Sequence, residues 1–288
     1  NKEAPAIMFT ENETNAARLF GAPNRTPHVR DAFHERVIAS KLDAAHPEER
    51  GTKCAAWYTL QLPPHGESVL RMRLHNRTES FEPFAPDSFE AVFEERIAEA
   101  DAFYATHISE EATEDQRNVC RQAYAGLLCS KQFYHYIVRD WISGDPDQPP
   151  PPPEHATIRN RQWEHLFNRD LISMPDKWEY PWYAAWDLAF HMIPMARIDI
   201  EFAKKQLLLL LREWYMHPNG QMPAYEFEFS DVNPPVHAWA CWRVYKMSGH
   251  RGERDRSFLE RAFLKLLMNF TWWVNRKDPE GRNLFSGG

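Results

Sequence analysis

The spacing of apolar residues along the chain changes its period near Asp87. Upstream, the runs 54–62 and 68–74 flank a Pro-Pro-His-Gly turn, and apolar and basic side chains alternate along the second run. Alternation of this kind predicts a half-buried β-hairpin, which is marginal alone and needs further strands. With 7–9 as a third strand and a short helix over 29–41, the pattern predicts the C-terminal part of a β-sandwich.

Downstream of Asp87 the apolar positions recur every three to four residues, which is the period of helices. Asp87 with Glu90, and Thr113 with Gln116, are pairs of the kind that cap helix N-termini. The proline run 149–153 cannot donate backbone hydrogen bonds and predicts an extended surface spacer. No strand is expected after Asp87. The predicted helices cover 87–104, 113–141, 183–197, 199–216, 235–248 and 257–276.

Helices joined in hairpins, with aromatic and polar motifs gathered in the loops, favour an (α/α) toroid whose inner helices present loop residues to a central funnel. The predicted fold class is therefore mainly α. A closed toroid of six hairpins needs about twelve helices, roughly twice the number predicted here. The alternative is a complete small helical bundle, which leaves the ring-rich loops unexplained. The expected domains are 1–76, the C-terminal part of a β-sandwich; 77–110, a linker and linking helix; and 111–288, the N-terminal half of the toroid.

The composition narrows the class of ligand. Eleven Trp, ten Tyr and eighteen Phe stand in a chain of mean hydropathy −0.63. So many rings in a polar chain indicate that some of them line a wet cleft, which is typical of carbohydrate binding. Lys and Arg number 34 against 41 Asp and Glu, and no basic stripe is present, so a nucleic-acid partner is not expected. No apolar run reaches the ~18 residues of a membrane span, so no membrane partner is expected.

The four cysteines, Cys54, Cys120, Cys129 and Cys241, show no Cys-x-x-Cys spacing. They are interpreted as buried thiols of a reducing compartment, and the expected location is the cytoplasm. No disulfide, metal or cofactor is expected. The chain opens at Asn1 without Met and stops after an apolar segment, so we expect the rest of its own polypeptide on both sides.

The strongest candidate site lies in the run 174–191, which reads Met-Pro-Asp-Lys-Trp-Glu-Tyr-Pro-Trp-Tyr-Ala-Ala-Trp-Asp-Leu-Ala-Phe-His. Pyranose rings stack on flat aromatic faces while carboxylates and amides bind hydroxyl pairs, so sugar sites mix these residue types. A helix that starts near Trp182 would place this ring, Trp186 and Asp187 on its first-turn face, with His191 one turn on. The alternative places both tryptophans in the core and makes Asp187 a salt-bridge partner. Burying an Asp beside a Trp is costly unless the carboxylate is used.

A second candidate segment, 217–235, reads His-Pro-Asn-Gly-Gln-Met-Pro-Ala-Tyr-Glu-Phe-Glu-Phe-Ser-Asp-Val-Asn-Pro-Pro. Asn219 and Gly220 predict a left-handed stop of the preceding helix. Asn233 predicts a cap for the next helix, with proline in its first turn. A loop fixed at both ends is suited to reading hydroxyl groups. The side chains that it would hold are Gln221, Tyr225 and Glu226.

Three segments together resemble the bacterial branch of glycoside hydrolase family 63. They are the Trp-Glu-Tyr-Pro-Trp and Ala-Ala-Trp-Asp run in 178–187, the Asn-Gly-Gln-Met-Pro-Ala-Tyr-Glu loop in 219–226, and Asn-Phe-Thr-Trp-Trp-Val-Asn in 269–275. That branch is similar to mannosylglycerate hydrolases and, more distantly, to the processing α-glucosidase of the eukaryotic glycan pathway and to trehalase. The likeness runs through the whole chain, including 10–15 and 19–21 in the preceding β-domain.

The resemblance implies an inverting six-hairpin α-glycosidase, of the α-glucosidase or of the mannosylglycerate or glucosylglycerate hydrolase type. In this mechanism an Asp acid protonates the glycosidic oxygen and a Glu base activates water, with the carboxyl groups roughly 6.5 to 9.5 Å apart. In the family both groups follow the helix that corresponds to 257–276, so they are expected beyond Gly288, with Asp187 as the fallback. The chain alone is then expected to be inactive, and its partner is an oligosaccharide or small glycoside. The residues expected to bind this substrate are Tyr180, Trp182, Trp186, Asp187, His191, Gln221, Tyr225 and Glu226.

Two other classes of function stay open. One is a non-catalytic sugar-binding or helical scaffold module that uses the aromatic loops. The other is a different α/α-toroid sugar enzyme such as an epimerase, which would use paired histidines as acid and base. His191 with His237 is the pair that the sequence offers for that chemistry.

Overall fold

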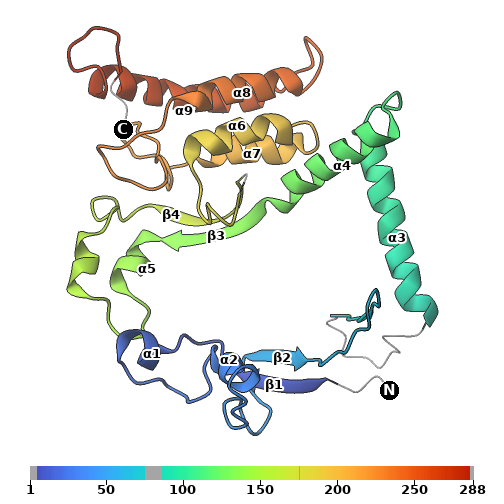
Figure 1. Ribbon diagram of the computed structural model, residues 1–288. Coiled ribbons are helices and arrows are strands. Elements are labelled where there is room, and N and C mark those ends of the chain that lie inside the picture. Colours follow the sequence, from blue (N-terminus) through green and yellow to red (C-terminus); the bar gives the residue numbers. More distant parts are fainter. Residues whose placement is uncertain (1–4, 75–85, 175, 286–288) are drawn as a thin grey trace. The chain divides into compact units, whose positions relative to one another are not determined.

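The computed structural model describes residues 5–74, 86–174 and 176–285 (Figure 1). This described part is mainly helical, with a few short strands. None of its helices is both long enough and apolar enough to cross a membrane. The chain divides into two compact units: Asn1–Ala85 with Asp145–Pro150, and Pro86–Gly144 with Pro151–Gly288. The domain boundaries expected from the sequence stay a prediction.

The first unit contains a two-stranded antiparallel sheet, with two short helices between its strands in sequence. The strand expected at 7–9 and the helix expected within 29–41 are both confirmed. The elements are β1 (Ala6–Thr10), α1 (Ala16–Phe20), α2 (Ala32–Val37) and β2 (Lys53–Trp57).

The predicted hairpin between 54–62 and 68–74 is wrong. β2 pairs with β1 instead, and 68–74 forms no strand, although the Gly66 N–H donates to the Pro63 carbonyl across the predicted turn at 2.9 Å. Apolar side chains along 68–74 are exposed, Val69 by 58%. Alternating apolar and polar residues stabilise a strand only when its apolar face is buried. The apolar side chains of 68–74 are exposed in the described chain, so their alternation does not produce a strand.

The second unit begins with two helices, α3 (Pro86–Ala105) and α4 (Glu114–Cys129). The capping box expected at the start of α4 is confirmed. Thr113 Oγ1 accepts from the Gln116 N–H at 3.2 Å, and Gln116 Oε1 accepts from the Thr113 N–H at 2.9 Å. The capping pair expected at the start of α3 involves Asp87, whose side chain lies outside the described residues.

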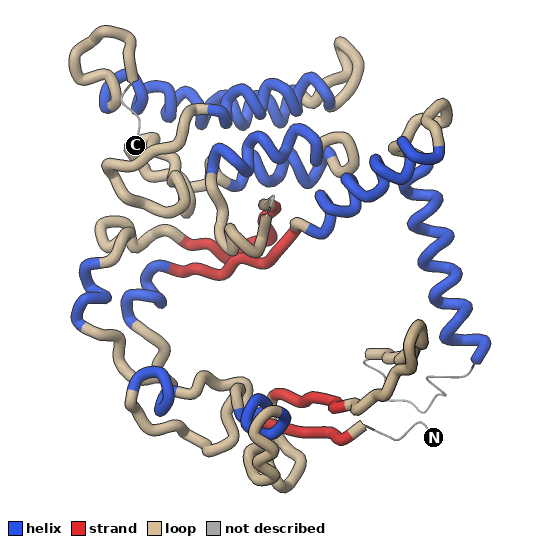
Figure 2. Tube along the Cα trace, in the orientation of Figure 1, coloured by secondary structure: helices blue, strands red, loops and turns tan. Residues whose placement is uncertain are grey.

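The helix predicted over 113–141 is too long, because the chain becomes extended after Ser130. β3 (Lys131–Ile137) follows α4 and pairs antiparallel with β4 (Phe167–Ser173), and Figure 2 shows these two strands in red among the helices. The expectation of no strand after Asp87 is therefore wrong. Two short helices lie between the strands in sequence, α5 (Val138–Ser143) and the 3₁₀ helix η1 (Pro153–Thr157).

The side-chain pattern of β4 explains why this sheet escapes detection in the sequence. Asn168 is fully buried, whereas Phe167 and Leu171 are 40% and 57% exposed. An amphipathic strand normally buries its apolar residues and exposes its polar ones, so the pattern of β4 is partly inverted. The sheet is nonetheless joined to the main core through Ile172 and Met174.

Four helices form the rest of the second unit and confirm the four helices predicted after 183. Figure 1 shows α6 beside α7, and α8 beside α9. α7 is shorter than the predicted 199–216, and Asp199 caps it by accepting from the Phe202 N–H at 3.0 Å. The bounds are α6 (Ala185–Met195), α7 (Ile200–Leu209), α8 (Val236–Met247) and α9 (Arg256–Arg276). Their shared core includes Leu188, Met192, Met195, Leu207, Leu210 and Tyr215.

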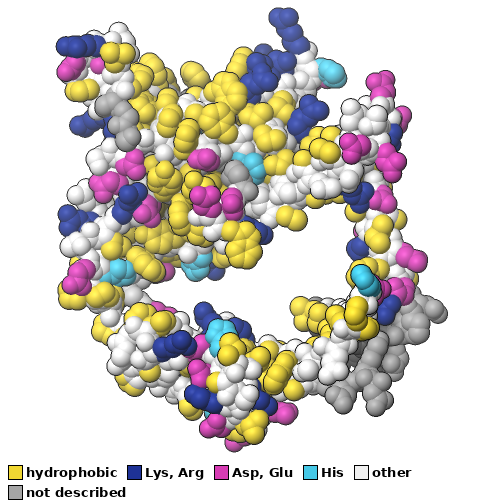
Figure 3. Space-filling view, in the orientation of Figure 1, with side chains coloured by type: hydrophobic (Ala, Val, Ile, Leu, Met, Phe, Trp, Pro, Cys, Tyr) yellow, Lys and Arg dark blue, Asp and Glu magenta, His cyan; other side chains and the backbone are white. Residues whose placement is uncertain are grey.

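Apolar side chains also lie on the surface of this helical group. Figure 3 shows hydrophobic side chains gathered over α8 and α9, among them Trp242, Phe263 and Phe270.

The expectation of four buried cysteines is wrong. Cys241 is buried on α8, but Cys120 is half-buried, and Cys54 and Cys129 are exposed; all four thiols are free. Cys54 lies on the exposed side of β2, and Cys129 is the last residue of α4, a helix without fully buried residues. Burial raises the pKa of Cys241 to about 12, so this thiol is neutral at pH 7.

Candidate functional site

The first turn of α6 is held by two loops. The Ala185 N–H donates to the Ala224 carbonyl oxygen at 2.7 Å, and the Trp186 N–H donates to Asn233 Oδ1 at 3.4 Å. These are N–H groups that a helix leaves without an internal partner. The loops before and after Glu226 are thereby fastened to the start of the Trp-Asp helix.

Two expectations about helix starts are wrong. α6 begins at Ala185, because Ala184 is extended, so Trp182 precedes the helix instead of lying on its first turn. α8 is preceded by Pro235 as N-cap without a side-chain hydrogen bond, so Asn233 does not cap it. Asn233 binds the start of α6 instead, because its side chain lies two residues too early to reach the first N–H groups of α8.

The loop that follows α7 is anchored on α9. Gly220 has a positive φ of 95°, and a Cβ at this position would collide with the Met268 carbonyl oxygen. Asn269 Nδ2 donates to the Gly220 carbonyl oxygen at 2.8 Å, and this Asn is 7% exposed. Gly220 is therefore required by close backbone approach. It does not stop the preceding helix as expected, since α7 already ends at Leu209.

Three segments far apart in the sequence meet in one small pocket. Trp186 comes from the first motif, Pro223 from the Gln-Met-Pro loop, and Trp273 from α9. The interior holds about 20 Å³, which is enough for about one water molecule. A pyranose ring does not fit inside, but a single hydroxyl group does. The remaining lining residues are Ala185, Met222, Val232, Asn233, Pro234, Pro235, His237 and Asn269.

Asp187 directly follows Trp186, one of the residues that line this pocket, and it is half-buried. Its carboxylate makes no hydrogen bond and no ion pair with any residue in the described part of the chain, and it does not cap α6. The charge of Glu179 raises the pKa of Tyr180, followed by burial and then by the charge of Asp187. Asp187 is thus close enough to Tyr180 for its charge to raise the pKa of the Tyr180 hydroxyl. This hydroxyl is protonated at neutral pH and can donate a hydrogen bond.

Several aromatic side chains belong to the same region as this carboxylate. The rings of Tyr180 and Trp182 meet edge to face with centroids 6.0 Å apart. Trp182 is 38% exposed and Trp186 is 37% exposed. Tyr225 is half-buried, and its electrostatic interaction with Tyr180 also raises the pKa of Tyr180. Partly exposed rings beside an unpaired carboxylate are the combination that a pyranose requires.

Two of the residues predicted to bind substrate, His191 and Gln221, are buried, and their role stays a prediction. His191 is 8% exposed, its Nδ1 lies 3.1 Å from Ser173 Oγ, and burial lowers its pKa. Gln221 is 2% exposed, and its Nε2 donates to the Asp231 carbonyl oxygen at 3.4 Å. The structure places both side chains within the fold and not among the exposed rings.

Glu226 faces a different part of the unit. It forms an ion pair with Arg159 at 3.4 Å, and its charge adds to burial in raising the pKa values of Tyr134 and Tyr136. No hydrogen bond or ion pair in the described chain joins Glu226 to Trp186 or Asp187. The structure therefore brings together Tyr180, Trp182, Trp186, Asp187 and Tyr225, and leaves Glu226, His191 and Gln221 outside this group.

His237 and Trp273 are pocket residues that the sequence did not assign to substrate binding. His237 was noted only as a partner for His191. The structure gives the two rings separate partners, since His237 Nε2 lies 2.7 Å from the Leu207 carbonyl oxygen. The sequence does contain one indication of this role for His237. Its position just after the prolines of 234–235 places it in the first turn of a helix, and side chains there face the loop that precedes the helix.

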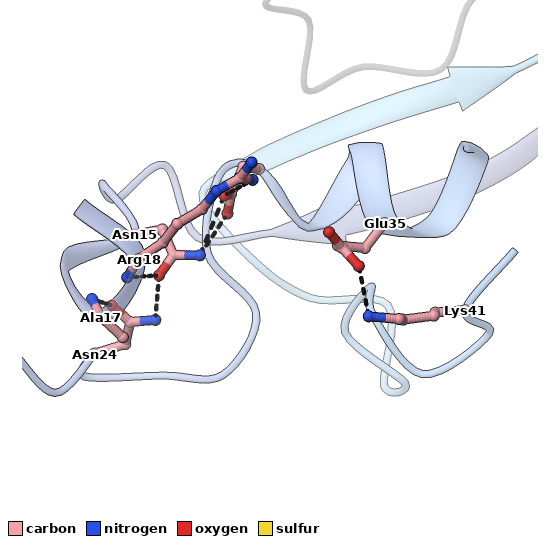
Figure 4. A network of polar contacts seen from close by, with 7 residues as sticks. Asn15, Ala17, Arg18, Asn24, Glu35 and Lys41 are labelled. Carbon is pink, nitrogen blue, oxygen red and sulfur yellow. Dashed lines mark hydrogen bonds and ion pairs between the residues drawn. The ribbon is translucent and has the colours of Figure 1, made fainter. Parts of the chain in front are cut away.

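The first unit contains a larger pocket of a different kind, with a volume of about 420 Å³. Asp31 accepts from Asn15 Nδ2 at 3.1 Å and from Arg18 Nη1 at 3.2 Å, and Lys41 donates to Glu35 at 2.6 Å (Figure 4). No Phe, Tyr or Trp lines this pocket in the described residues. Among those residues no group of three His, Cys, Asp or Glu side chains is arranged to hold a metal ion.

Comparison with known proteins identifies the region that holds the ring-lined pocket. Residues 180–287 match the family model of the mannosylglycerate hydrolase MGH1-like glycoside hydrolase domain. This region is similar to a glycosidase domain. All residues that line the pocket fall within it. The resemblance to glycoside hydrolases drawn from the three motifs is thereby confirmed for this region, at the level of the glycosidase domain.

A relative from yeast is much longer than this chain. The chain is 49% identical over 295 residues to an uncharacterized protein of Saccharomyces cerevisiae, YMR196W. The alignment covers 99% of this chain and 27% of the yeast protein. The chain therefore spans about a quarter of the length of this relative.

Proposed function

We propose that residues 180–275 form the sugar-binding part of a glycoside hydrolase. The observation that carries this proposal is the unpaired, half-buried carboxylate of Asp187, which directly follows Trp186, a partly exposed ring that lines the pocket where the three motif segments meet. A buried or half-buried charge without a partner is unfavourable, and it persists in folds mainly where a ligand uses it.

Asp187 has the chemistry that a sugar requires. A carboxylate accepts hydrogen bonds from two neighbouring hydroxyl groups, and such charge-assisted bonds are shorter and stronger than neutral ones. Trp186 and Trp182 supply flat faces for the C–H side of a pyranose. Tyr180 adds a hydroxyl that can donate to a ring substituent, since its raised pKa keeps it protonated. One small group of residues thus offers a face, an acceptor pair and a donor.

In this proposal, hydrolysis requires more of the polypeptide than residues 1–288. The reaction class is inversion at an α-glycosidic bond, with the acid and base carboxylates supplied by polypeptide beyond Gly288 and the helices of 111–288 forming half of a toroid. The proposed substrate is a small glycoside of the mannosylglycerate type, which the name of the matched domain supports, or of the glucosylglycerate type. The cytoplasm is the proposed location. Residues 1–288 are then expected to bind a sugar without hydrolysing it.

A non-catalytic sugar-binding module is the second candidate, because the same pocket and carboxylate serve it equally well. An epimerase is less favoured. It needs two histidines that face one substrate, whereas His191 and His237 are each buried and held by separate partners.

The proposal is tested by calorimetric titration of residues 1–288 with mannosylglycerate, glucosylglycerate, trehalose and the α-methyl glycosides of glucose and mannose. Asp187→Asn should weaken binding by about 2 to 4 kcal/mol, since each lost charge-assisted bond is worth about 1.5 to 3 kcal/mol before water compensates. Asp115→Asn is the matched control, because Asp115 also lies in the first turn of a helix, on exposed α4. Absence of sugar binding, or equal binding by wild type and Asp187→Asn, contradicts the proposal.

A further inference from the structure

Asn160 has an unfavourable backbone conformation inside the fold. It lies between η1 and β4, it is 3% exposed, and its φ is 76°, in the left-handed region that residues other than glycine seldom adopt. Such a conformation costs free energy and persists only where the surrounding contacts impose it. Residues of this kind cluster at active sites and ligand clamps, so the contacts of Asn160 indicate what it holds.

These contacts join Asn160 to Phe227, in the loop 217–235 that holds the second motif. The Asn160 N–H donates to the Phe227 carbonyl oxygen at 2.9 Å, and Asn160 Oδ1 accepts from the Phe227 N–H. Asn160 Nδ2 donates to the Tyr136 hydroxyl oxygen on β3 at 3.0 Å, and the Asn160 carbonyl oxygen accepts from the Trp163 N–H at 2.7 Å. Each polar atom of Asn160 therefore has a partner, and both backbone groups of Phe227 bind this one residue.

Neighbours of Asn160 contact the same loop at other points. The ring centroids of Trp163 and His217 lie 4.3 Å apart, at the start of the loop. Arg159 forms an ion pair with Asp231 at 3.6 Å, nearer the end of the loop. Because this ion pair is partly exposed, it contributes little to the free energy of unfolding. The buried hydrogen bonds of Asn160 are thus the main attachment in the middle of the loop.

Two attachments lie on either side of Tyr225 and Glu226. On one side, the Ala224 carbonyl oxygen accepts from the first N–H of α6 at 2.7 Å. On the other side, Phe227 is bound to Asn160 through both of its backbone groups. A span of two residues that is fixed at both ends has few conformations open to it. The backbone of Tyr225 is therefore held in place without a ligand.

We infer that Asn160 is a positioning residue of the sugar site, which holds Tyr225 in its binding orientation in the sugar-free protein. The inference rests on the proposed function and on the place of Tyr225 in the group that contains Asp187. A side chain that is already ordered loses little entropy when a ligand binds, so the affinity is higher than for a mobile one. Asn160 is buried and acts without touching the sugar.

Asn160→Gly is the variant that separates anchoring from strain. Glycine adopts a positive φ readily, so the substitution removes the side-chain bonds to the Phe227 N–H and the Tyr136 hydroxyl and adds no strain. Asn283→Gly is the matched control, because Asn283 also has a positive φ, of 58°, and is exposed. Calorimetry gives the affinity of residues 1–288 for mannosylglycerate, glucosylglycerate, trehalose and the α-methyl glycosides of glucose and mannose, and the melting temperature of each variant is measured beside it.

The expected result is coupling between Asn160 and Tyr225. Asn160→Gly should weaken the binding of each sugar that wild type binds by about tenfold, the factor that corresponds to ordering about one residue on binding. This loss should disappear in a Tyr225→Ala background, because Asn160 acts through Tyr225. Asn160→Asp should retain most of the affinity, since its carboxylate can accept from the Phe227 N–H and from the Tyr136 hydroxyl. The control should match wild type throughout.

Hydrogen exchange tests the attachment of the loop without any substitution. The Phe227 amide should exchange slowly in the sugar-free protein and gain little further protection when a sugar binds. A Phe227 amide that becomes protected only after a sugar is added overturns the inference.

Three outcomes of the binding experiment contradict the inference in distinguishable ways. If Asn160→Gly lowers the melting temperature and leaves every affinity unchanged, Asn160 serves stability alone. If it weakens binding equally in the wild-type and Tyr225→Ala backgrounds, Asn160 does not act through Tyr225. If wild type binds none of these sugars, the proposed function fails and the inference fails with it.

Discussion

The pocket of the first unit and the pocket at the start of α6 and α8 differ in size and in how their polar groups are satisfied. The first holds about 420 Å³, and its charged groups Arg18, Asp31, Glu35 and Lys41 pair with one another. The second holds about 20 Å³, yet His237 Nδ1 has no partner in the described chain. In the larger pocket these four charged groups are paired, whereas in the smaller one a buried acceptor has no partner in the described chain.

We propose the smaller pocket as part of the binding site in spite of its smaller volume. Trp186 and Trp273, which line it, indicate the chemistry of the ligand, because flat aromatic faces pack against the C–H side of a pyranose.

The largest effect is expected in the dependence of stability on pH. Burial lowers the pKa of His237 from 6.5 to about 4. As pH falls through this window the unfolded chain binds a proton that the folded chain does not, so stability present above pH 6.5 is lost towards pH 4. The loss is about 3 kcal/mol for a shift of this size. Urea unfolding at pH 7 and pH 4 should show a smaller loss in His237→Gln, and an unchanged loss in His34→Gln of the first unit.

The next effect concerns the anchoring of the loop on α9. Gly220→Ala should lower the free energy of unfolding by about 2 kcal/mol. Alanine is strained at this positive φ, and its Cβ would collide with the Met268 carbonyl oxygen. Gly21 is the matched control in the first unit, since it has a φ of 67° but no atom within 4 Å of an added Cβ. Gly21→Ala should cost about 1 kcal/mol or less. Equal losses of stability for the two substitutions would show that the close contact between Gly220 and α9 does not affect stability.

The helices and the sheet of the second unit illustrate what could be read from the sequence. α6 to α9 were predictable because their apolar residues recur at the helical period over ten or more positions. β3 and β4 were not, because Asn168 points inward while Leu171 is exposed. Which face of β4 is buried depends on the helices packed against it, and tertiary packing of this kind leaves no periodic signal.

The candidate site was predictable in part for a similar reason. Trp186 and Asp187 stand together in the sequence, so their combination was visible there. His237 was not assigned, because its open acceptor follows from a bond to the Leu207 carbonyl, 30 residues away. The sugar-binding role predicted for Glu226 stays a prediction; in the structure this carboxylate pairs with Arg159, and its charge adds to burial in raising the pKa of Tyr134 on β3. A loop sequence does not show which way its side chains point.

A smaller effect is expected in the first unit. Asp31→Ala should lower the free energy of unfolding by about 1 kcal/mol, because it removes partly exposed hydrogen bonds from Asn15 and Arg18. Sugar affinity should not change. Loss of sugar binding in this variant would move the binding site to the larger pocket and reverse the comparison.

The smallest effect is expected at the exposed pair in the same pocket. The hydrogen bond and charge of Lys41 hold the pKa of Glu35 below its usual value. Lys41→Met should raise the Glu35 pKa, measured by carbon-13 NMR titration of its carboxyl group, and leave the melting temperature and sugar affinity nearly unchanged. A large loss of stability would show that this pair holds the unit together.

The central claim is that the sugar binds at Trp186 and Asp187, and fluorine-19 NMR of 5-fluorotryptophan-labelled residues 1–288 tests it most directly. Each signal is assigned by replacing one tryptophan with phenylalanine. Addition of mannosylglycerate, glucosylglycerate, trehalose or the α-methyl glycosides of glucose and mannose should shift the signals of Trp182 and Trp186 and leave that of Trp57, on β2 of the first unit, unmoved. A shift at Trp57 alone, or at no tryptophan, would contradict the claim.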